Sequence, residues 1–442
     1  ILYGKILYSP FHMSVGGNLN YTVASLPSPP AIVSGPVNVS GAIMSDWTWT
    51  KSGNPYFIKG HVVVISGVTL TIDPGVEIHF QDCYELIMKG TLNAVGTSDN
   101  PIIWKVSTGF TSCQDSQMSF LRFAETTLAS HSIEYFNMEG LADRSLRCIK
   151  VGQESEHNQG EKNSGNLIIK TSTFKNCLLQ TDGYSSNAKL YIYDSTIRSS
   201  KVHGTYPRSE AIYLMRSMII DTDLHHDSYH EGFFVENSTM ENTNFQDGCC
   251  NPGFQIKGST ISNSKSSSSS NTFGSFENTA FINVTLANIQ QTTFSSCTFD
   301  FYAKPQESSS GCCGSPTVPD HHVSGQLQSI TNSYFRCHGE GVPYFAIGIN
   351  QVSYGSSASA GITIDGCGKG IQYMSGATGS ISNSQFLGIT GTIIENSSDE
   401  DITATNNYWG TAELHVITEK IIDFYDSILY GKILYSPFHM SV

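Results

Sequence analysis

A short pattern that returns about every twenty residues constrains this chain more than any other feature of its sequence. A serine, usually a threonine and then an apolar residue recur, and the apolar members are Phe174, Ile197, Ile219, Met240, Ile261 and Phe281. The steps between them are 23, 22, 21, 21 and 20 residues. Apolar and polar residues alternate over four or five positions around them, which predicts short strands rather than helices. Each step therefore predicts one coil of a β-solenoid, with apolar residues stacked at about 4.8 Å.

Two residues after each apolar position the side chain is polar and most often asparagine. The positions are Asn176, Ser199, Asp221, Asn242, Asn263 and Asn283, and Asn383 repeats the theme in a later coil. Asparagine tolerates a left-handed backbone and can hydrogen-bond to the same residue in neighbouring coils. The pattern predicts an internal asparagine ladder in an all-β, right-handed parallel β-helix. A β-sandwich with regular turns is the alternative, although sandwiches seldom keep so constant a spacing.

Motifs near both ends of the chain resemble a known architecture. Residues 68–78, 90–97 and 101–104 resemble the opening coils of right-handed β-helix surface proteins in the pectate-lyase-like superfamily. Residues 406–411, 421–426 and 436–438 resemble the closing cap of such modules. The resemblance implies the architecture and leaves activity open, because this fold carries enzymes, adhesins and structural proteins. Within the cap, Leu414, Ile417, Ile421 and Tyr425 recur at helical spacing and predict a short C-terminal capping helix.

A longer repeat frames the chain. Residues 1–15 read ILYGKILYSPFHMSV, and residues 428–442 repeat the same fifteen residues at an offset of 427. We interpret residues 1–15 as the tail end of a preceding module, 16–30 as a linker, and 31–440 as a β-helix module that ends in the NNYWG and SPF motifs. Either the natural polypeptide carries tandem modules, or separate modules assemble with an identical partner head to tail. Both interpretations imply an array.

Composition narrows the setting and the partners. The net charge is −14 without any basic patch, which argues against nucleic-acid binding. No apolar run approaches the length of a membrane-spanning helix. Eleven cysteines and five N-x-[ST] glycosylation sequons favour an extracellular or cell-surface location. The sequons begin at Asn20, Asn38, Asn237, Asn283 and Asn396.

The cysteines predict structural disulfides rather than a metal or redox site, because none lies in a C-x-x-C motif. The candidates are Cys249, Cys250, Cys297, Cys312, Cys313 and Cys337. The two vicinal pairs among them either cross-link loops or modules, or form local bonds, and we favour local bonds. Cys297 and Cys337 follow Phe294 and Phe335 closely, so they would lie close together if the long segment between them bulges out.

One group of residues is a weak candidate for a polysaccharide or metal site. His203 and His225 each lie six residues past an apolar marker, so their rings are expected to stack on neighbouring coils, and Asp227 lies eight past its own. Imidazoles and carboxylates on one face can bind a divalent metal or serve as acid and base on a polysaccharide. We favour the alternative that they are solvated turn residues, and we predict no catalytic residue, bound metal or cofactor.

Three hypotheses for function follow. The first is an extracellular structural protein whose modules join end to end into a filament, stalk or fibre, and the terminal repeat motivates it. The second is a β-helix protein that binds or degrades polysaccharides through His203, His225 and Asp227. The third is an adhesin displayed on a β-helical stalk, which differs from the first only in having a specific partner.

Overall fold

The computed structural model describes most of the chain from residue 34 onward. The described residues are 34–106, 119–124, 131–141, 147–151, 166–182, 189–205, 212–227, 232–247, 253–266, 271–272, 274–302, 323–338, 345–349 and 357–441. Residues 1–33, which include the N-terminal copy of the repeat, the linker and the sequon at Asn20, lie outside this part.

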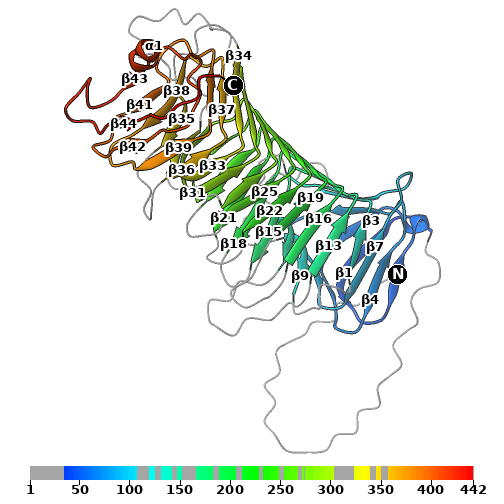
Figure 1. The fold of residues 1–442 in the computed structure, drawn as a ribbon. Coiled ribbons are helices and arrows are strands. Elements are labelled where there is room, and N and C mark those ends of the chain that lie inside the picture. The colour runs from blue at the N-terminus through cyan, green and yellow to red at the C-terminus, as the bar shows by residue number, and fades with distance from the viewer. Residues whose placement is uncertain are drawn as a thin grey trace, which may run out of the picture.

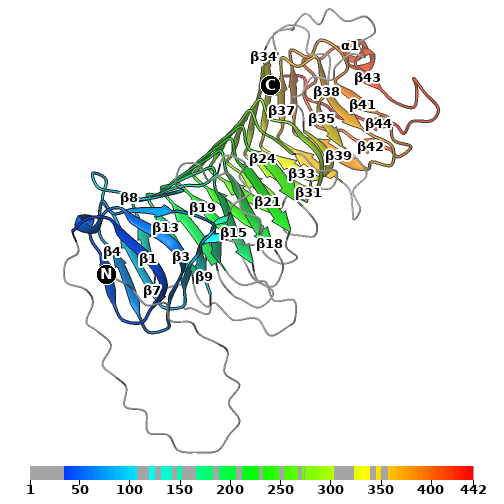
Figure 2. The same ribbon diagram turned by 180° about the vertical axis from the view of Figure 1, so that it is seen from behind.

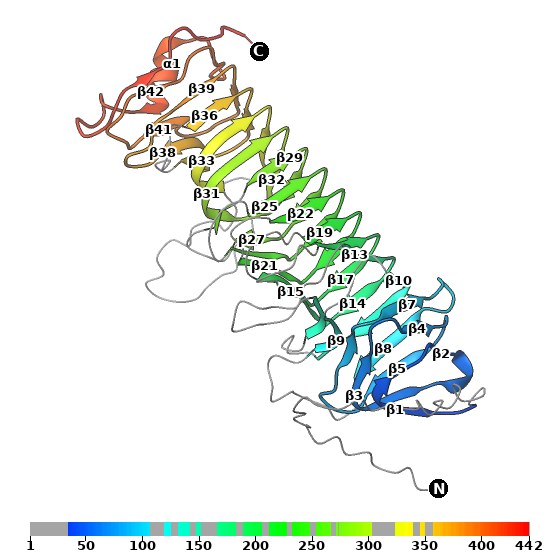
Figure 3. The same cartoon turned by 90° about the horizontal axis from the view of Figure 1, so that it is seen from below.

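The chain winds into an elongated solenoid, and its first and last strands lie at opposite ends of the molecule (Figures 1 and 2). The strands of successive coils lie side by side along the axis (Figure 3), and their pairing in the described residues is parallel throughout. Three rows of strands form the three sides of each coil. The predicted right-handed parallel β-helix is therefore confirmed, and the β-sandwich alternative is wrong.

Two long strands, β1 (Val37–Ile43) and β3 (Tyr56–Val64), begin both row 1 and row 2, with the short helix η1 (Lys51–Gly53) between them. Row 1 continues with β5 (Glu77–Phe80), β8 (Ile102–Val106), β11 (Phe136–Glu139), β14 (Thr173–Lys175), β17 (Thr196–Arg198), β20 (Met218–Ile220), β23 (Thr239–Glu241), β26 (Thr260–Ser262), β30 (Ala280–Ile282), β32 (Thr298–Tyr302), β34 (Tyr334–His338), β37 (Thr363–Asp365) and β40 (Gln385–Leu387).

Row 2 continues with β6 (Leu86–Met88), β9 (Ser119–Phe123), β12 (Arg147–Val151), β15 (Leu178–Asp182), β18 (Lys201–Thr205), β21 (Asp223–Asp227), β24 (Asn244–Asp247), β27 (Lys265–Ser266), β28 (Asn271–Thr272), β35 (Phe345–Ile349), β38 (Lys369–Tyr373), β41 (Ile394–Asn396) and β43 (Ile421–Ile422).

Row 3 consists of β2 (Trp47–Trp49), β4 (Thr69–Ile72), β7 (Thr91–Val95), β10 (Ser132–Glu134), β13 (Asn166–Lys170), β16 (Lys189–Tyr193), β19 (Ile212–Met215), β22 (Phe233–Glu236), β25 (Phe254–Lys257), β29 (Ser275–Glu277), β31 (Leu286–Ser295), β33 (Val323–Thr331), β36 (Ser357–Ala360), β39 (Gly379–Ser382), β42 (Ile402–Thr403) and β44 (Ile433–Leu434). The long strands β31 and β33 also extend into row 2.

The core is a set of stacked apolar columns inside the solenoid. The six apolar markers of the sequence pattern are direct register partners from coil to coil in row 1, and each is fully buried. Further along the row, the rings of Phe281, Phe299 and Phe335 stack at centroid distances of 4.4 and 4.3 Å. Burying one such side chain stabilises the fold by about 2 kcal/mol, so each coil is held mainly by its neighbours.

The asparagine ladder lies on the outside of a turn, not in the interior. Asn176, Asn242, Asn263 and Asn283 have φ between 49° and 54°, the left-handed conformation, at the turn from row 1 to row 2. The side chains of Asn242 and Asn263 are exposed. Asn383 (φ 51°) belongs to a different column, at the turn from row 3 to row 1. Asn242 donates to Asp221 (3.0 Å) and Asn283 donates to Asn263 (3.4 Å), so the predicted left-handed backbone and the bonds between coils are present. The predicted interior location was wrong, because the residue after the left-handed one points inward instead.

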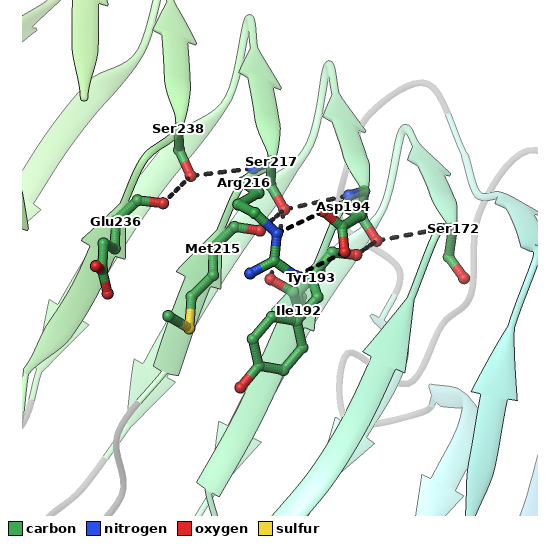
Figure 4. A network of polar contacts seen from close by, with 10 residues as sticks. Ser172, Ile192, Tyr193, Asp194, Met215, Arg216, Ser217, Glu236 and Ser238 are labelled. Atoms are coloured by element: carbon green, nitrogen blue, oxygen red, sulfur yellow. Dashed lines mark hydrogen bonds and ion pairs between the residues drawn. The ribbon is translucent and has the colours of Figure 1, made fainter. Parts of the chain in front are cut away.

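Serine and threonine form the interior ladders. A buried serine occupies the turn from row 3 to row 1 in five consecutive coils. The five serines are Ser172, Ser195, Ser217, Ser238 and Ser259. The Ser217 hydroxyl donates to the Met215 carbonyl (2.9 Å) and accepts the backbone N–H of Ser195 in the preceding coil (3.2 Å). Figure 4 shows this chain of hydrogen bonds running through successive coils. The buried backbone donors of the turn are thereby satisfied.

The C-terminal end carries the predicted short helix, α1 (Leu414–Glu419). Ile417 is its buried residue, whereas Leu414 is 54% exposed, and Ile421 belongs to β43 rather than to the helix. Tyr425 is 81% exposed, so it does not continue the apolar face as the spacing predicted. Within the described residues, no helix is both long and apolar enough to cross a membrane.

Candidate functional site

The C-terminal copy of the fifteen-residue repeat supplies the row 3 strand that completes the last coil of the solenoid. Its strand β44 pairs in parallel with β42, and the Ile433 side chain is only 3% exposed. The Ala404 N–H donates to the Leu434 carbonyl (2.8 Å), and the His439 N–H donates to the Asn407 carbonyl (2.9 Å). The repeat is therefore an integral structural element, and it is folded against the coil before it.

Side chains from this last coil and the residues just before it make the C-terminal end apolar. Of the thirteen large apolar side chains exposed in the described part of the chain, seven lie between residues 414 and 440. They include Tyr425 (81% exposed), Ile428 (83%), Leu429 (76%) and Met440 (68%). We call these seven residues the terminal apolar surface, and its members are Leu414, Phe424, Tyr425, Ile428, Leu429, Leu434 and Met440. Large apolar groups that are exposed to solvent favour association.

A second candidate surface lies on the outward side of row 2. One outward position in five consecutive coils carries a polar side chain, and we call these residues, Arg122, Lys150, Gln180, His203 and His225, the polar column. The rings of His203 and His225 stack at 4.3 Å with 5° between their planes, the arrangement that their spacing predicts. Asp227 ends β21, and its side chain is not among those described.

The polar column is partly closed. Lys150 and Gln180 are each 3% exposed, and Arg147, 8% exposed, hydrogen-bonds to the Gln180 side chain. At the end of the column, the buried Glu85 carboxylate accepts both the N–H (3.0 Å) and the hydroxyl (3.1 Å) of Ser119. Arg122 lies 3.8 Å from Glu85. Sequence reasoning found only the two histidines here. Gln180 has the same offset of six residues, from Phe174, and could have been found by counting, whereas Lys150 and Arg122 lie 12 and 18 residues past the corresponding Met138 and Trp104.

The outward side of row 3 carries stacked aromatic rings. Tyr191 and Tyr213 stack at 4.2 Å, and Tyr213 and Phe234 stack at 4.7 Å. The neighbouring rings cover the faces of Tyr213, so it does not offer a face to a sugar ring. Beside this stack, Arg216 donates two hydrogen bonds to Asp194 (2.8 and 2.7 Å; Figure 4). That contact holds the pKa of the Asp194 carboxyl below its usual value.

A compact cluster in row 1 was not predicted from the sequence. The Asp300 carboxylate lies 3.0 Å from Nε2 of His338 and 3.8 Å from Arg336, and the ring of Tyr302 stacks on His338 at 4.4 Å. The Tyr334 hydroxyl donates to Asp365 (2.7 Å). Asp300, Arg336 and Asp365 each follow an inward apolar residue by one position, and this shared offset is the signal that could have found them.

Of the predicted disulfide candidates that the structure describes, Cys337 forms a disulfide and Cys297 does not. Cys148 bonds to Cys177, and Cys337 bonds to Cys367. Cys297 is a buried free thiol, so its predicted proximity to Cys337 did not produce a disulfide. It takes the position that serine holds in other coils, and its Sγ contacts the Ser295 carbonyl at 3.4 Å. Cys249, Cys250, Cys312 and Cys313 lie outside the described residues.

The glycosylation sequons fall in different environments. Asn38 and Asn237 are exposed, and Asn283 is half-buried with its side-chain oxygen accepting the N–H of Tyr302. Asn396 is fully buried, and its amide donates to the Glu400 carbonyl (2.9 Å) and accepts the Ser398 N–H (3.1 Å). Because its side chain is enclosed and already bonded, Asn396 is not a glycan acceptor in the folded chain.

Metal ligands do not converge in the part of the chain that the structure describes. Among those residues no group of three or more His, Cys, Asp or Glu side chains could hold a metal ion. The two stacked histidines of the polar column therefore supply at most two neighbouring imidazoles to a ligand.

Comparison with known proteins gives one short match in sequence and three in structure. No family model matches the chain. The chain is 35% identical over 65 residues to Protein bark beetle of Drosophila melanogaster, a match that covers 15% of this chain and 2% of that protein. The chain thus spans a small part of the length of this curated relative.

The three similar structures are enzymes. They are a catalytic domain of a GH87 alpha-1,3-glucanase (9% identity, 74% of this chain and 61% of that one, TM-score 0.25), a DFA-IIIase from Arthrobacter chlorophenolicus A6 (10%, 84% and 89%, 0.26) and a mannuronan C-5 epimerase A-module from Azotobacter vinelandii (10%, 92% and 90%, 0.21). Identities and TM-scores this low do not support a transfer of activity. The function of this chain therefore has to be argued from its own surfaces.

Proposed function

We propose that this chain is one module of an extracellular structural array in which parallel β-helices follow one another. The observation that carries the proposal is the place of residues 428–441, which complete the final coil of this solenoid with its row 3 strand. Because residues 1–15 have the same sequence, they would form the final coil of a preceding module. The 427-residue offset is then the length of one structural unit.

The terminal apolar surface supports this proposal. Residues such as Ile428 and Leu429 are more than three-quarters exposed in a single module, and a following module would cover them. Covering one such side chain contributes about 2 kcal/mol, so a few of them are enough to orient two modules. The disulfides Cys148–Cys177 and Cys337–Cys367 are compatible with an oxidising, secreted setting.

The test is the mass and the axial period of the native protein. On a denaturing gel, an antibody against this module should detect a polypeptide of at least twice 48.2 kDa. Electron micrographs should show rods with a repeat near 70 Å, since β2 and β44 are separated by fifteen steps of about 4.8 Å along row 3. A native polypeptide of about 48 kDa that appears only as rods one module long would contradict the proposal.

A second candidate function is the binding of an anionic polysaccharide along the polar column. The observation that favours it is the stacked pair His203 and His225, which lies at the half-buried end of the polar column beyond the buried Lys150 and Gln180. A double His203→Ala, His225→Ala variant should weaken binding to anionic glycans at least fivefold, while Thr239→Ala, exposed in row 1, should leave it unchanged. Equal binding by both variants would exclude this surface as the site.

A further inference from the structure

The last coil is built from contacts between the repeat and the residues just before it. The Ile402 N–H donates to the Lys432 carbonyl (2.8 Å), and the Asn406 N–H donates to the Pro437 carbonyl (2.6 Å). The ring of Tyr435 packs edge-on against Trp409 at 6.0 Å, and Ile433 is buried beside β42. Residues 398–409 therefore form a binding site for a fifteen-residue segment, and the same molecule fills it.

Each chain carries two identical segments that fit this site. In the N-terminal copy, Ile6 corresponds to Ile433, Tyr8 to Tyr435 and Phe11 to Phe438. Because every residue is the same, the N-terminal copy can make the same backbone hydrogen bonds and bury the same side chains. The site itself does not distinguish the two copies, so the distance that each must travel decides which one occupies it.

That distance favours a second molecule over the chain's own N-terminus. The sixteen strands of row 3 place β2 and β44 fifteen steps apart, or about 70 Å. The twenty-one residues 16–36 connect the N-terminal copy to β1 and reach at most about 75 Å when fully extended. Reaching its own far end would therefore require an almost straight connection along the whole solenoid, whereas the end of another molecule carries no such constraint.

We propose that residues 1–15 are an exchange segment that docks as the last coil on a second copy of this chain when residues 428–442 leave that place. The contact is head to tail and does not close on itself, so repeated exchange produces an open filament. The proposal rests on the assignment of the repeat as the end of a module's final coil. It adds non-covalent joining between chains whose residues 1–15 are not already held by a preceding module of the same polypeptide.

The test removes the resident copy and leaves the exchange segment intact. In the full chain, Ile433→Asp places a charge at a buried position of the last coil and should release residues 428–442. Sedimentation velocity should then show multimers that grow with concentration. The double variant Ile6→Asp, Ile433→Asp should sediment as a monomer. Ser436→Asp, at an exposed position of the same segment that is not part of the terminal apolar surface, should sediment like the unaltered chain.

A peptide-binding measurement shows whether the variant keeps a folded binding site. A fluorescent peptide of sequence ILYGKILYSPFHMSV should bind the double variant saturably, and the same peptide with aspartate at its sixth position should bind roughly tenfold or more weakly. An Ile433→Asp chain that is folded, stays monomeric and does not bind the peptide would overturn the exchange proposal. The proposal of a covalent tandem array would still stand after that result, because it is tested separately by the mass of the native polypeptide.

Discussion

Removing one hydroxyl from the interior serine ladder should open the backbone locally. The Ser238 side chain, 4% exposed, donates to the Glu236 carbonyl (2.9 Å) and accepts the Ser217 N–H of the preceding coil (3.1 Å). In Ser238→Ala, the Glu236 carbonyl still accepts the Arg216 N–H (2.9 Å). The Ser217 N–H, by contrast, loses its acceptor inside the solenoid.

The expected magnitude follows from that single unsatisfied donor. A buried N–H without a partner costs about 1–3 kcal/mol, so we expect a loss of about 2 kcal/mol of local stability. Because 1.4 kcal/mol corresponds to a factor of ten, the Ser217 amide should exchange with solvent deuterium roughly thirtyfold faster. Ser238→Thr should keep the protection, since Thr222, in the ladder at the neighbouring turn, donates to the Ile220 carbonyl (2.8 Å) and accepts the Ser200 N–H (3.4 Å).

The assay is hydrogen exchange read by fragmentation mass spectrometry at single-residue resolution. The matched control is Thr239→Ala, which removes a hydroxyl from the next residue, where the side chain is exposed. The explanation would fail if the Ser217 amide exchanged within threefold of its original rate in Ser238→Ala. It would also fail if Thr239→Ala accelerated that amide equally, because the effect would then not come from the buried hydrogen bond.

Three further predictions concern other buried or strained positions. Burial lowers the pKa of His131 to about 4, so the unfolded chain takes up a proton at a higher pH than the folded chain does. The free energy of unfolding should therefore be constant above about pH 6.5 and fall by on the order of 3 kcal/mol between there and pH 4. Urea unfolding of His131→Asn should show little of this decrease. Burial raises the pKa of the Cys297 thiol to about 11, so mass spectrometry should find it unmodified by iodoacetamide in the native chain and modified after unfolding. Asn242 has φ 49°, so Asn242→Ala should lower the free energy of unfolding by about 1 kcal/mol and Asn242→Gly by clearly less, as measured by denaturant titration.

The coil register could be predicted because the steric demands of stacking repeat in every coil. Phe174, Ile197 and Ile219 mark the same inward position, and only the number of residues in each turn changes between them. Whether a polar residue of a turn points into the solenoid or out to solvent could not be predicted in the same way. Asn242 and Thr243 are adjacent and both polar, and the left-handed φ of the first decides that the second lies inside.

A different physical reason explains why Cys148, Cys177, Cys367 and Lys150 were missed. Cys148 and Cys177 are 29 residues apart, and Cys337 and Cys367 are 30 apart, which is longer than the 20–23-residue coil. Residues inserted between the strands must leave the coil before the partners meet, and their number is not encoded in the repeat. Lys150 reaches the column beside Gln180 across such an insertion, so counting from the apolar markers does not find it.

The interior ladders also bear on how solenoids of this kind change length during evolution. Each coil offers its neighbour a hydroxyl and receives one in return, as Ser200 accepts the Cys177 N–H (3.0 Å) and Ser264 accepts the Thr243 N–H (2.9 Å). Each ladder coil thus presents a hydroxyl acceptor to the coil before it and a backbone N–H donor to the coil after it. An additional coil would therefore find partners for its hydrogen bonds on both sides, and the loss of a coil would leave no buried donor without an acceptor. Relatives of this chain should therefore differ in length by whole coils of about 20–23 residues, while changes of other sizes accumulate in the segments between the strands.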